Sequence, residues 1–317
     1  MVDVITVGSA TIDVFMRTET DITKLNLGEK VLVDCMDIET GGGGTNSAVA
    51  LSRLGLNVKY LGKLGSDKFS NIIEHNLKEE KVKLVKIEKD KKHHTPYSVI
   101  LNQKGKDRVI FAFKGSANHL DTFPKNEIKD TKWIYLASMM GRSFNTVKKM
   151  VNFAHKNNVK ILFNPSNYLS CKGVKYLISI INKTEILVMN KDEALELLNK
   201  RKCKIETLLI ELHKLGPKTV VITDGAKGAF AYDGTSSYSV KPLNVKVVQT
   251  AGAGDAFTAG FLTGIIKKDN IHDALKIGMA NAASVVQHYG TKNKLLNYKE
   301  AENMIKKHNC TIKERLL

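Results

Sequence analysis

The sequence predicts an α/β protein with three α/β/α layers, in which helices cover both faces of a mostly parallel central sheet and a small β-sheet projects from it. Short apolar runs rich in β-branched residues alternate with helix-like stretches along most of the chain. Parallel neighbours in a sheet require crossover connections, and the helices in those connections cover both faces. Two glycine-rich turns lead into helices, and two extended segments interrupt the alternation.

The alternation defines the expected elements in order. The strand-like runs are short and apolar: Val4–Gly8, Val58–Leu61, Trp133–Leu136, Lys160–Phe163, Ile186–Met189 and Thr219–Thr223. The helix-like stretches between the later runs cover Asn145–Asn157, Val174–Asn182, Lys191–Asn199 and Ile205–Leu215. In sheets of this kind ligands bind at the carboxyl ends of the strands, so we expect the functional site there.

The two interrupting segments, 13–39 and 96–113, carry β-branched and aromatic residues and little helical periodicity. Residues Lys104–Asp107 are typical of a hairpin turn within the second segment. We interpret both segments as a small β-sheet, and long surface hairpins are the alternative. No internal repeat or long linker divides the chain, so we expect residues 1–317 to form a single domain.

Composition excludes several functional classes. The chain has 317 residues, of which 43% are hydrophobic, and it can bury a full core. No apolar run approaches the length of a membrane span, and no basic leader precedes the first apolar run. The four cysteines show no Cys-x-x-Cys spacing and are expected to be free thiols. We therefore expect a cytoplasmic protein that does not bind a membrane.

The net charge of +17 invites the hypothesis of a nucleic-acid partner. However, the excess is mostly dispersed lysine, and no basic stretch is interleaved with aromatic residues. Nucleic-acid binding is therefore not expected. A positive field around a cleft equally favours a nucleoside triphosphate.

The first glycine-rich turn, Gly41–Gly44, leads through Asn46 into an apolar stretch at helical spacing that ends near Gly55. Asn46 offers both a donor and an acceptor to a polar ligand. A flexible surface turn with Asn46 as a helix cap is the alternative.

The second turn, Gln249-Thr250-Ala251-Gly252-Ala253-Gly254-Asp255, leads into an apolar, helix-like run. Its small residues let backbone N–H groups approach a polyanion at the positive end of a helix. A carboxylate beside a phosphate is repelled, so Asp255 is poorly suited to binding alone. It is well suited to accepting a proton from a hydroxyl that attacks the phosphate. An ordinary helix start with Asp255 as the N-cap is the alternative.

Together the two turns resemble the two signatures of the ribokinase-like (PfkB) family of carbohydrate and nucleoside kinases. Further family motifs match in the same order along nearly the whole chain: Asp13, Gly62-x-x-Gly65-x-Asp67, Lys114–Asn118, Asn190-x-x-Glu193 and Thr223–Gly228. The resemblance implies a ribokinase-like fold whose small sheet is a lid. It also implies ATP and Mg²⁺ as cofactors, a small-molecule sugar or nucleoside as the acceptor, and allows a homodimer formed through the lid.

The resemblance also implies roles for individual residues. Asp255 would be the general base. The backbone N–H groups of Ala253, Gly254 and Asp255, with Gly252 giving access, would stabilise charge on the phosphoryl oxygens. The sugar hydroxyls would be bound by a second set of residues: Asp13, Gly42, Gly43 and Asn46.

A third set would serve the nucleotide and its metal. Thr223, Gly225 and Gly228 would line the nucleotide site, with Asn281 near the adenine. Asn190 and Glu193 would position Mg²⁺ through its waters.

Each residue of this third set has a structural alternative. Asn190 is equally well placed as a helix N-cap with Glu193 as its capping-box partner. Asn281 is equally well explained as an ordinary helix residue.

One position departs from the family pattern. The family usually has Asp where this chain has Gln249, and in many members that acid helps to hold a monovalent cation. A neutral amide lacks the charge, so a monovalent cation is in doubt here.

The leading hypothesis is an ATP-dependent kinase that phosphorylates a hydroxymethyl group of a sugar, like a ribokinase or fructokinase. A nucleoside kinase is the nearest alternative, and a non-catalytic sugar-binding protein is disfavoured because Asp255 is present. A dinucleotide oxidoreductase fails on spacing, since Phe257 and Asn46 stand where Gly-x-Gly-x-x-Gly needs its third glycine. The pair His93-His94 has no metal-ligand context in the sequence and is expected to be exposed.

Overall fold

The computed structural model of the chain describes residues 2–103 and 108–317. Its larger sheet has ten strands in the order β14 (Ile312–Leu316), β13 (Ser236–Val240), β12 (Ala229–Tyr232), β11 (Thr219–Thr223), β10 (Ile186–Asn190), β9 (Lys160–Phe163), β8 (Thr131–Leu136), β1 (Val2–Val7), β4 (Val58–Leu61) and β5 (Lys83–Leu84). All pairs from β11 to β5 are parallel, and β12–β14 continue the sheet antiparallel. The predicted mostly parallel sheet is confirmed.

The antiparallel edge formed by β12, β13 and β14 was not predicted. The strand–helix alternation identifies only strands that are joined by crossover helices. Strands β12 and β13 are joined by a short turn, and β13 carries serines and a tyrosine rather than a continuous apolar run.

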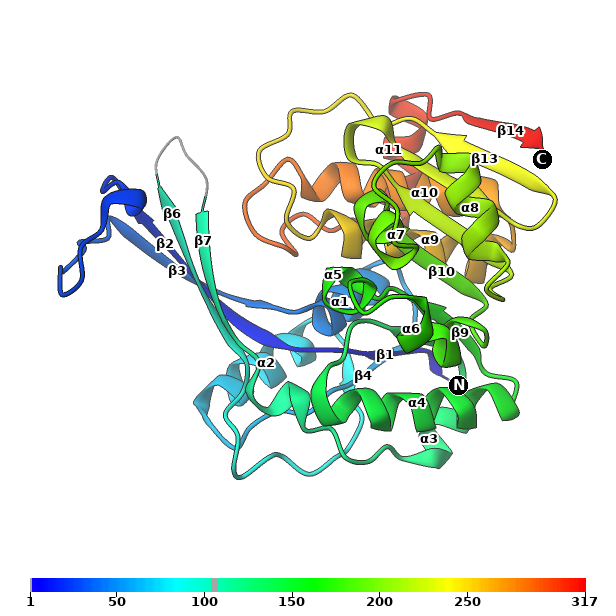
Figure 1. Ribbon diagram of the computed structural model, residues 1–317. Coiled ribbons are helices and arrows are strands. Elements are labelled where there is room, and N and C mark those ends of the chain that lie inside the picture. The colour runs from blue at the N-terminus through cyan, green and yellow to red at the C-terminus, as the bar shows by residue number, and fades with distance from the viewer. Residues whose placement is uncertain (1, 104–107) are drawn as a thin grey trace.

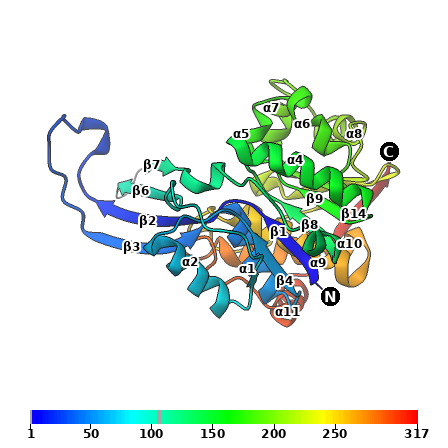
Figure 2. The same cartoon turned by 90° about the horizontal axis from the view of Figure 1, so that it is seen from below.

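Helices cover both faces of the large sheet (Figures 1 and 2). One face packs against α1 (Gly43–Arg53), α2 (Lys68–Glu79), α9 (Ala253–Lys268), α10 (Ile271–Val285) and α11 (Tyr298–Lys307). The other packs against α3 (Lys125–Lys129), α4 (Gly141–Lys156), α5 (Ser166–Ser170), α6 (Val174–Ile181), α7 (Lys191–Leu197) and α8 (Ile205–His213). Neighbouring strand residues such as Val4 and Ile5 belong to opposite cores, because side chains alternate along a strand. Among the described residues, no helix is both long and apolar enough to cross a membrane.

The smaller sheet has the order β3 (Cys35–Gly41), β2 (Thr11–Thr18), β6 (Tyr97–Gln103) and β7 (Arg108–Phe113), and it projects from the body of the molecule (Figure 1). It is built from the two predicted extended segments. The first segment also contains a short 3₁₀ helix, Ile22–Lys24. The turn predicted over Lys104–Asp107 lies outside the described residues.

The two faces of the small sheet differ in polarity. Asp13 lies opposite Glu39 and Ser98 on one face. The adjacent residue Val14 lies opposite Ile38 and Val99 on the other face. The second face exposes apolar side chains to solvent: Met36, Ile38, Val109, Phe111 and Phe113.

Helices α9 and α10 pack with their backbones in close approach. A Cβ on Gly264 of α9 would lie 2.3 Å from Cα of Ala274, and one on Gly260 would lie 2.7 Å from Cα of Gly278. Small residues at these crossings therefore fix how closely the two helices lie, and with that the position of the start of α9.

We expect Gly264→Ala to destabilise the protein by about 1–3 kcal/mol, because backbone rather than a mobile side chain meets the new methyl group. Equilibrium denaturation measures the change. The control is Gly254→Ala in the same helix, where the new Cβ meets nothing within 4 Å and no destabilisation is expected. Equal stability of the two variants would contradict the close α9–α10 packing.

Candidate active site

The first glycine-rich turn brings the start of α1 against the carboxyl end of β1. Gly42 has φ of 96°, and a Cβ there would lie 2.5 Å from the Ser9 carbonyl oxygen. A Cβ on Gly44 would lie 2.8 Å from Cα of Gly8. Only glycine permits this close approach, so packing fixes the conformation of the turn. The alternative of a flexible surface turn does not apply.

The second turn leaves an open helix start. Gly252, with φ of 79°, is the N-cap of α9. Among the described residues, the N–H groups of Gly254 and Asp255 have no hydrogen-bond partner, and the space beside Gly254 is open. The Ala253 N–H, by contrast, donates to the Thr250 carbonyl oxygen at 3.3 Å. Two free N–H groups at the positive end of a helix suit an anion.

Asn46 and Asp255 meet between the two turns. The Asn46 amide Nδ2 donates to Asp255 Oδ2 at 2.9 Å, and Thr291 Oγ1 donates to Asn46 Oδ1 at 3.2 Å. Neither residue caps its helix, because the N-caps are Gly42 and Gly252 without side-chain bonds. The capping alternatives for both residues are therefore wrong.

The environment of Asp255 tunes its acidity. Burial raises the pKa of its carboxyl group to about 6, and the hydrogen bond from Asn46 opposes this shift by favouring the ionised form. A carboxylate with a pKa near neutrality is matched to accepting a proton and releasing it again.

A cavity of about 320 Å³ lies beside Asp255 at the carboxyl ends of the strands. It brings together three predicted residues from distant segments: Asp13 of the small sheet with Gly42 and Gly43 of the first turn. Asn46 reaches the same place through its bond to Asp255. The remaining lining is mostly polar. It includes both ends of the Lys114–Asn118 motif and residues not singled out from the sequence, such as Ser98, Asn164 and Tyr168.

Asp13 lies within strand β2 and not in a turn after the first strand. Thr11 Oγ1 donates to its Oδ1 at 3.1 Å. Burial raises the pKa of Asp13, while hydrogen bonds and the charges of Lys292 and Lys114 oppose that shift. Gly41 stands beside it, where a Cβ would overlap the carboxylate.

Lys114 is the one cationic side chain among the cavity's described lining residues. Its Nζ lies 4.4 Å from the centroid of the Tyr168 ring. Among the described residues, no carboxylate lies within ion-pair distance of it. Lys114 belongs to the Lys114–Asn118 motif of the sequence, but nothing local in that motif indicates that its side chain reaches the cavity.

The predicted nucleotide-binding residues lie around the end of β11. Thr223 ends the strand, and Gly225 begins a 3₁₀ turn, Gly225–Lys227, with φ of 47° and open space around it. Gly228 has a structural reason to be glycine, because a Cβ there would overlap the Val240 carbonyl oxygen.

Asn190 and Glu193 form a capping box at the start of α7. Glu193 N–H donates to Asn190 Oδ1 at 2.8 Å, and Asn190 N–H donates to a Glu193 carboxylate oxygen at 2.9 Å. Burial raises the pKa of Glu193, and the charge of Asp255 adds to the rise. The capping alternative is therefore confirmed, and the buried carboxylate also lies within electrostatic reach of Asp255.

Asn281 is fully buried, with its Nδ2 donating to the Ala256 carbonyl oxygen and its Oδ1 accepting from the Leu296 N–H. Both ends of the amide are thus hydrogen-bonded to backbone groups. Asn281 therefore fits the alternative of an ordinary helix residue and not an adenine contact.

The Gln249 side chain is a neutral amide, whose carbonyl Oε1 accepts from the Gly290 N–H at 3.3 Å. It brings no negative charge that would hold a monovalent cation.

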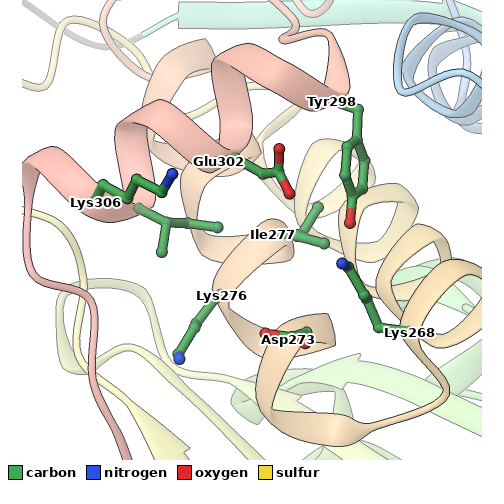
Figure 3. A pocket seen from close by; sticks show the side chains of 8 residues that line it. Lys268, Asp273, Lys276, Ile277, Tyr298, Glu302 and Lys306 are labelled. Atoms are coloured by element: carbon green, nitrogen blue, oxygen red, sulfur yellow. The ribbon is translucent and has the colours of Figure 1, made fainter.

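A second hollow, of about 180 Å³, lies between α9, α10 and α11 (Figure 3). Its side chains have mixed charge, such as Lys268, Lys276 and Glu302. It lies at the end of α9 remote from Asp255 and contains none of the predicted site residues.

Curated relatives include several kinases. The chain is 29% identical over 286 residues to 5-dehydro-2-deoxygluconokinase of Clostridium perfringens, covering 84% of each chain. It is 28% identical over 276 residues to ribokinase of Haemophilus influenzae, covering 84% of this chain and 88% of the relative. It is also 28% identical over 270 residues to nucleoside kinase of Methanocaldococcus jannaschii, covering 84% and 86%.

Solved structures show the same fold. The nucleoside kinase of Methanocaldococcus jannaschii superposes with a TM-score of 0.82 at 25% identity, covering 96% of this chain and 99% of that one. The ribokinase of Arabidopsis thaliana, complexed with ribose and ATP, gives 0.85 at 22% identity, covering 96% and 99%. The model of the pfkB family of carbohydrate kinases matches residues 1–297. The chain therefore belongs to the PfkB family and is a ribokinase-like sugar or nucleoside kinase.

Proposed function

We propose that this kinase transfers the γ-phosphoryl group of ATP to a hydroxymethyl group of a small sugar, like a ribokinase or fructokinase. One observation carries the proposal: Asp255, held by Asn46 and with a pKa of about 6, borders a cavity at the open start of α9. A coupled phosphoryl-transfer screen over pentoses, hexoses, sugar acids and nucleosides tests it. Absence of transfer to every acceptor would overturn it.

The chemistry follows from this arrangement. The Asp255 carboxylate accepts the proton of the acceptor hydroxyl as that oxygen attacks the γ-phosphorus, and the bond to the bridging oxygen breaks to release ADP. The free N–H groups of Gly254 and Asp255 stabilise charge on the phosphoryl oxygens. Mg²⁺ supplies charge neutralisation on the triphosphate when bound, and Glu193 would hold it through water. Thr223 and Gly225 would line the nucleotide.

The cavity supports an acceptor that carries hydroxyls and a negative charge. The Asp13 carboxylate can accept from two neighbouring hydroxyls at once. Lys114, without a carboxylate partner among the described residues, is placed to bind an anionic group of the acceptor. The clostridial relatives, named 5-dehydro-2-deoxygluconokinases, also favour a sugar acid.

A nucleoside acceptor is the second candidate, because one relative of comparable identity is a nucleoside kinase. The same screen separates the two acceptors. A non-catalytic sugar-binding protein is disfavoured by the placement of Asp255 at the open helix start.

We expect Asp255→Asn to lower kcat by about 10²–10⁴, because the amide has the same shape but cannot accept the proton. Nucleotide binding, measured by calorimetry, should be nearly unchanged. Asp269→Asn is the control, since it alters an exposed acid at the other end of the same helix. Retention of most activity by Asp255→Asn would contradict its assignment as the base.

The rate should depend on pH through Asp255. Below pH about 6 the carboxyl group is protonated, so kcat/KM should fall roughly tenfold per pH unit. Asn46→Ala removes a hydrogen bond that favours the ionised form and should move this limb to higher pH. Initial rates between about pH 5 and 8 measure both effects. A shift to lower pH would refute the role of Asn46.

Lys114→Met should lower kcat/KM for sugar acids by roughly tenfold or more and leave neutral sugars almost unaffected. Asp13→Ala is the comparison, because it should lower kcat/KM for both classes with little change in ATP affinity. Steady-state kinetics on a matched pair of acceptors measure the split. Equal losses on both classes in Lys114→Met would remove the case for an anionic acceptor.

We also propose a homodimer formed through the outer face of the small sheet. Phe111 is 63% exposed and Ile38 is 52% exposed, and they share this face with other apolar residues. A contiguous apolar patch of this kind marks an interface. Phe111→Glu should shift the sedimentation coefficient from that of a dimer to that of a monomer, with Lys175→Glu at an exposed position of α6 as the control. A monomeric unmodified protein would contradict this.

A further inference from the structure

Two histidines meet at the base of the β6–β7 hairpin of the small sheet. His93 lies shortly before β6, and His119 follows the end of β7. Their rings are stacked, with centroids 3.6 Å apart and an angle of 7° between the planes. The Ser116 N–H donates to the His94 carbonyl oxygen at 2.9 Å and joins the same two chain segments. The pair therefore lies where the chain enters and leaves the hairpin.

A carboxylate completes this cluster. Asp90 Oδ1 accepts from the N–H groups of Lys92 and His93 at 2.8 and 3.0 Å, which fixes the loop. Asp90 Oδ2 lies 2.9 Å from His93 Nδ1. Neither ring nitrogen of His119 has a hydrogen-bond partner among the described residues. The cluster thus contains one oriented imidazole, one fixed carboxylate and one imidazole that is free to bind.

We propose that Asp90, His93 and His119 form a Zn²⁺ site. Each residue offers one ligand atom, and these atoms all lie within 4.8 Å of one another. Zinc bonds to nitrogen and oxygen are roughly 2.0–2.2 Å, so the cluster must contract around the ion and the two stacked rings must tilt until their nitrogens converge on it. The Asp90–His93 pair already has the spacing of neighbouring ligands. Zinc takes the place of the proton between that pair, this proton moves through solvent to Nε2 of the same His93 ring, and water fills the fourth position.

The chemistry of the cluster selects the metal. Two imidazoles and one carboxylate suit zinc and similar transition metals, whereas Mg²⁺ prefers oxygen ligands.

The site is distinct from the proposed Mg²⁺ position and was not foreseen in the sequence. The neighbourhood of His93 in the sequence offers no metal ligand pattern, because its partner His119 is remote in sequence. His94, whose side chain is 80% exposed, lies 3.5 Å from Asp67 and is not part of the cluster. His119 directly follows Asn118, which lines the acceptor cavity. Bound zinc would tie both ends of the β6–β7 hairpin together beside that cavity.

Zinc titration of the full chain without a polyhistidine tag, in competition with a chromophoric zinc indicator, tests the proposal. His93→Gln and His119→Gln should each lower zinc affinity at least tenfold, whereas His94→Gln should not change it. Asp90→Asn should also weaken binding while keeping an oxygen to accept the loop N–H groups. Millimolar Mg²⁺ should not compete. Unchanged affinity in His119→Gln, or an equal loss in His94→Gln, would overturn the site.

Thermal unfolding provides a second readout that does not depend on kinase activity. Zinc should raise the Tm of the unmodified protein and of His94→Gln, because a ligand that binds only the folded state stabilises it. It should not raise the Tm of His119→Gln. An equal rise in all three proteins would assign the binding to other groups, such as the free cysteines, and overturn the proposal.

Discussion

The site depends on one hydrogen bond, from Asn46 to Asp255, which joins residues 209 positions apart in the sequence. It requires the starts of α1 and α9 to converge above the carboxyl ends of the strands. Glycine makes this possible in both turns: a Cβ on Gly42 or Gly252 would lie 2.5 Å from a carbonyl oxygen of another segment. Thr291 then holds the far side of the Asn46 amide. The position of the Asp255 carboxylate is therefore set by backbone packing.

Burial of the Asp255 carboxylate has an energetic cost, and this cost raises its pKa toward neutrality. A buried anion is unfavourable unless hydrogen bonds compensate, and the single bond from Asn46 compensates only in part, so the pKa of Asp255 remains raised. The nearby Glu193 is also buried, and its pKa is raised as well. Among the described residues, the N–H groups of Gly254 and Asp255 have no hydrogen-bond partner at the positive end of α9. The site thus combines a carboxylate that is easily protonated with two N–H groups that suit an anion.

The strands of the small sheet have one face toward the cavity and one apolar outer face. Because side chains alternate, Asp13 points with Ser98 to the cavity while Val14 lies on the opposite, apolar face. A one-residue change in register would exchange these faces. At the base of its β6–β7 hairpin His93 and His119 stack, and His119 directly follows Asn118, which lines the cavity.

The sequence by itself determined the parallel sheet, both glycine turns and some of the residues that line the cavity, such as Asp13 and Asp255, because periodicity and glycine spacing are local signals. It also identified Asp255, but it could not exclude that this acid was a helix cap. Only the tertiary structure decided that Gly252 is the cap, that the Asn281 amide is committed to backbone groups, and that Lys114 enters the cavity. It also brought His119 to His93. These contacts depend on how segments that are remote in the sequence pack against one another, and no local sequence pattern encodes that packing.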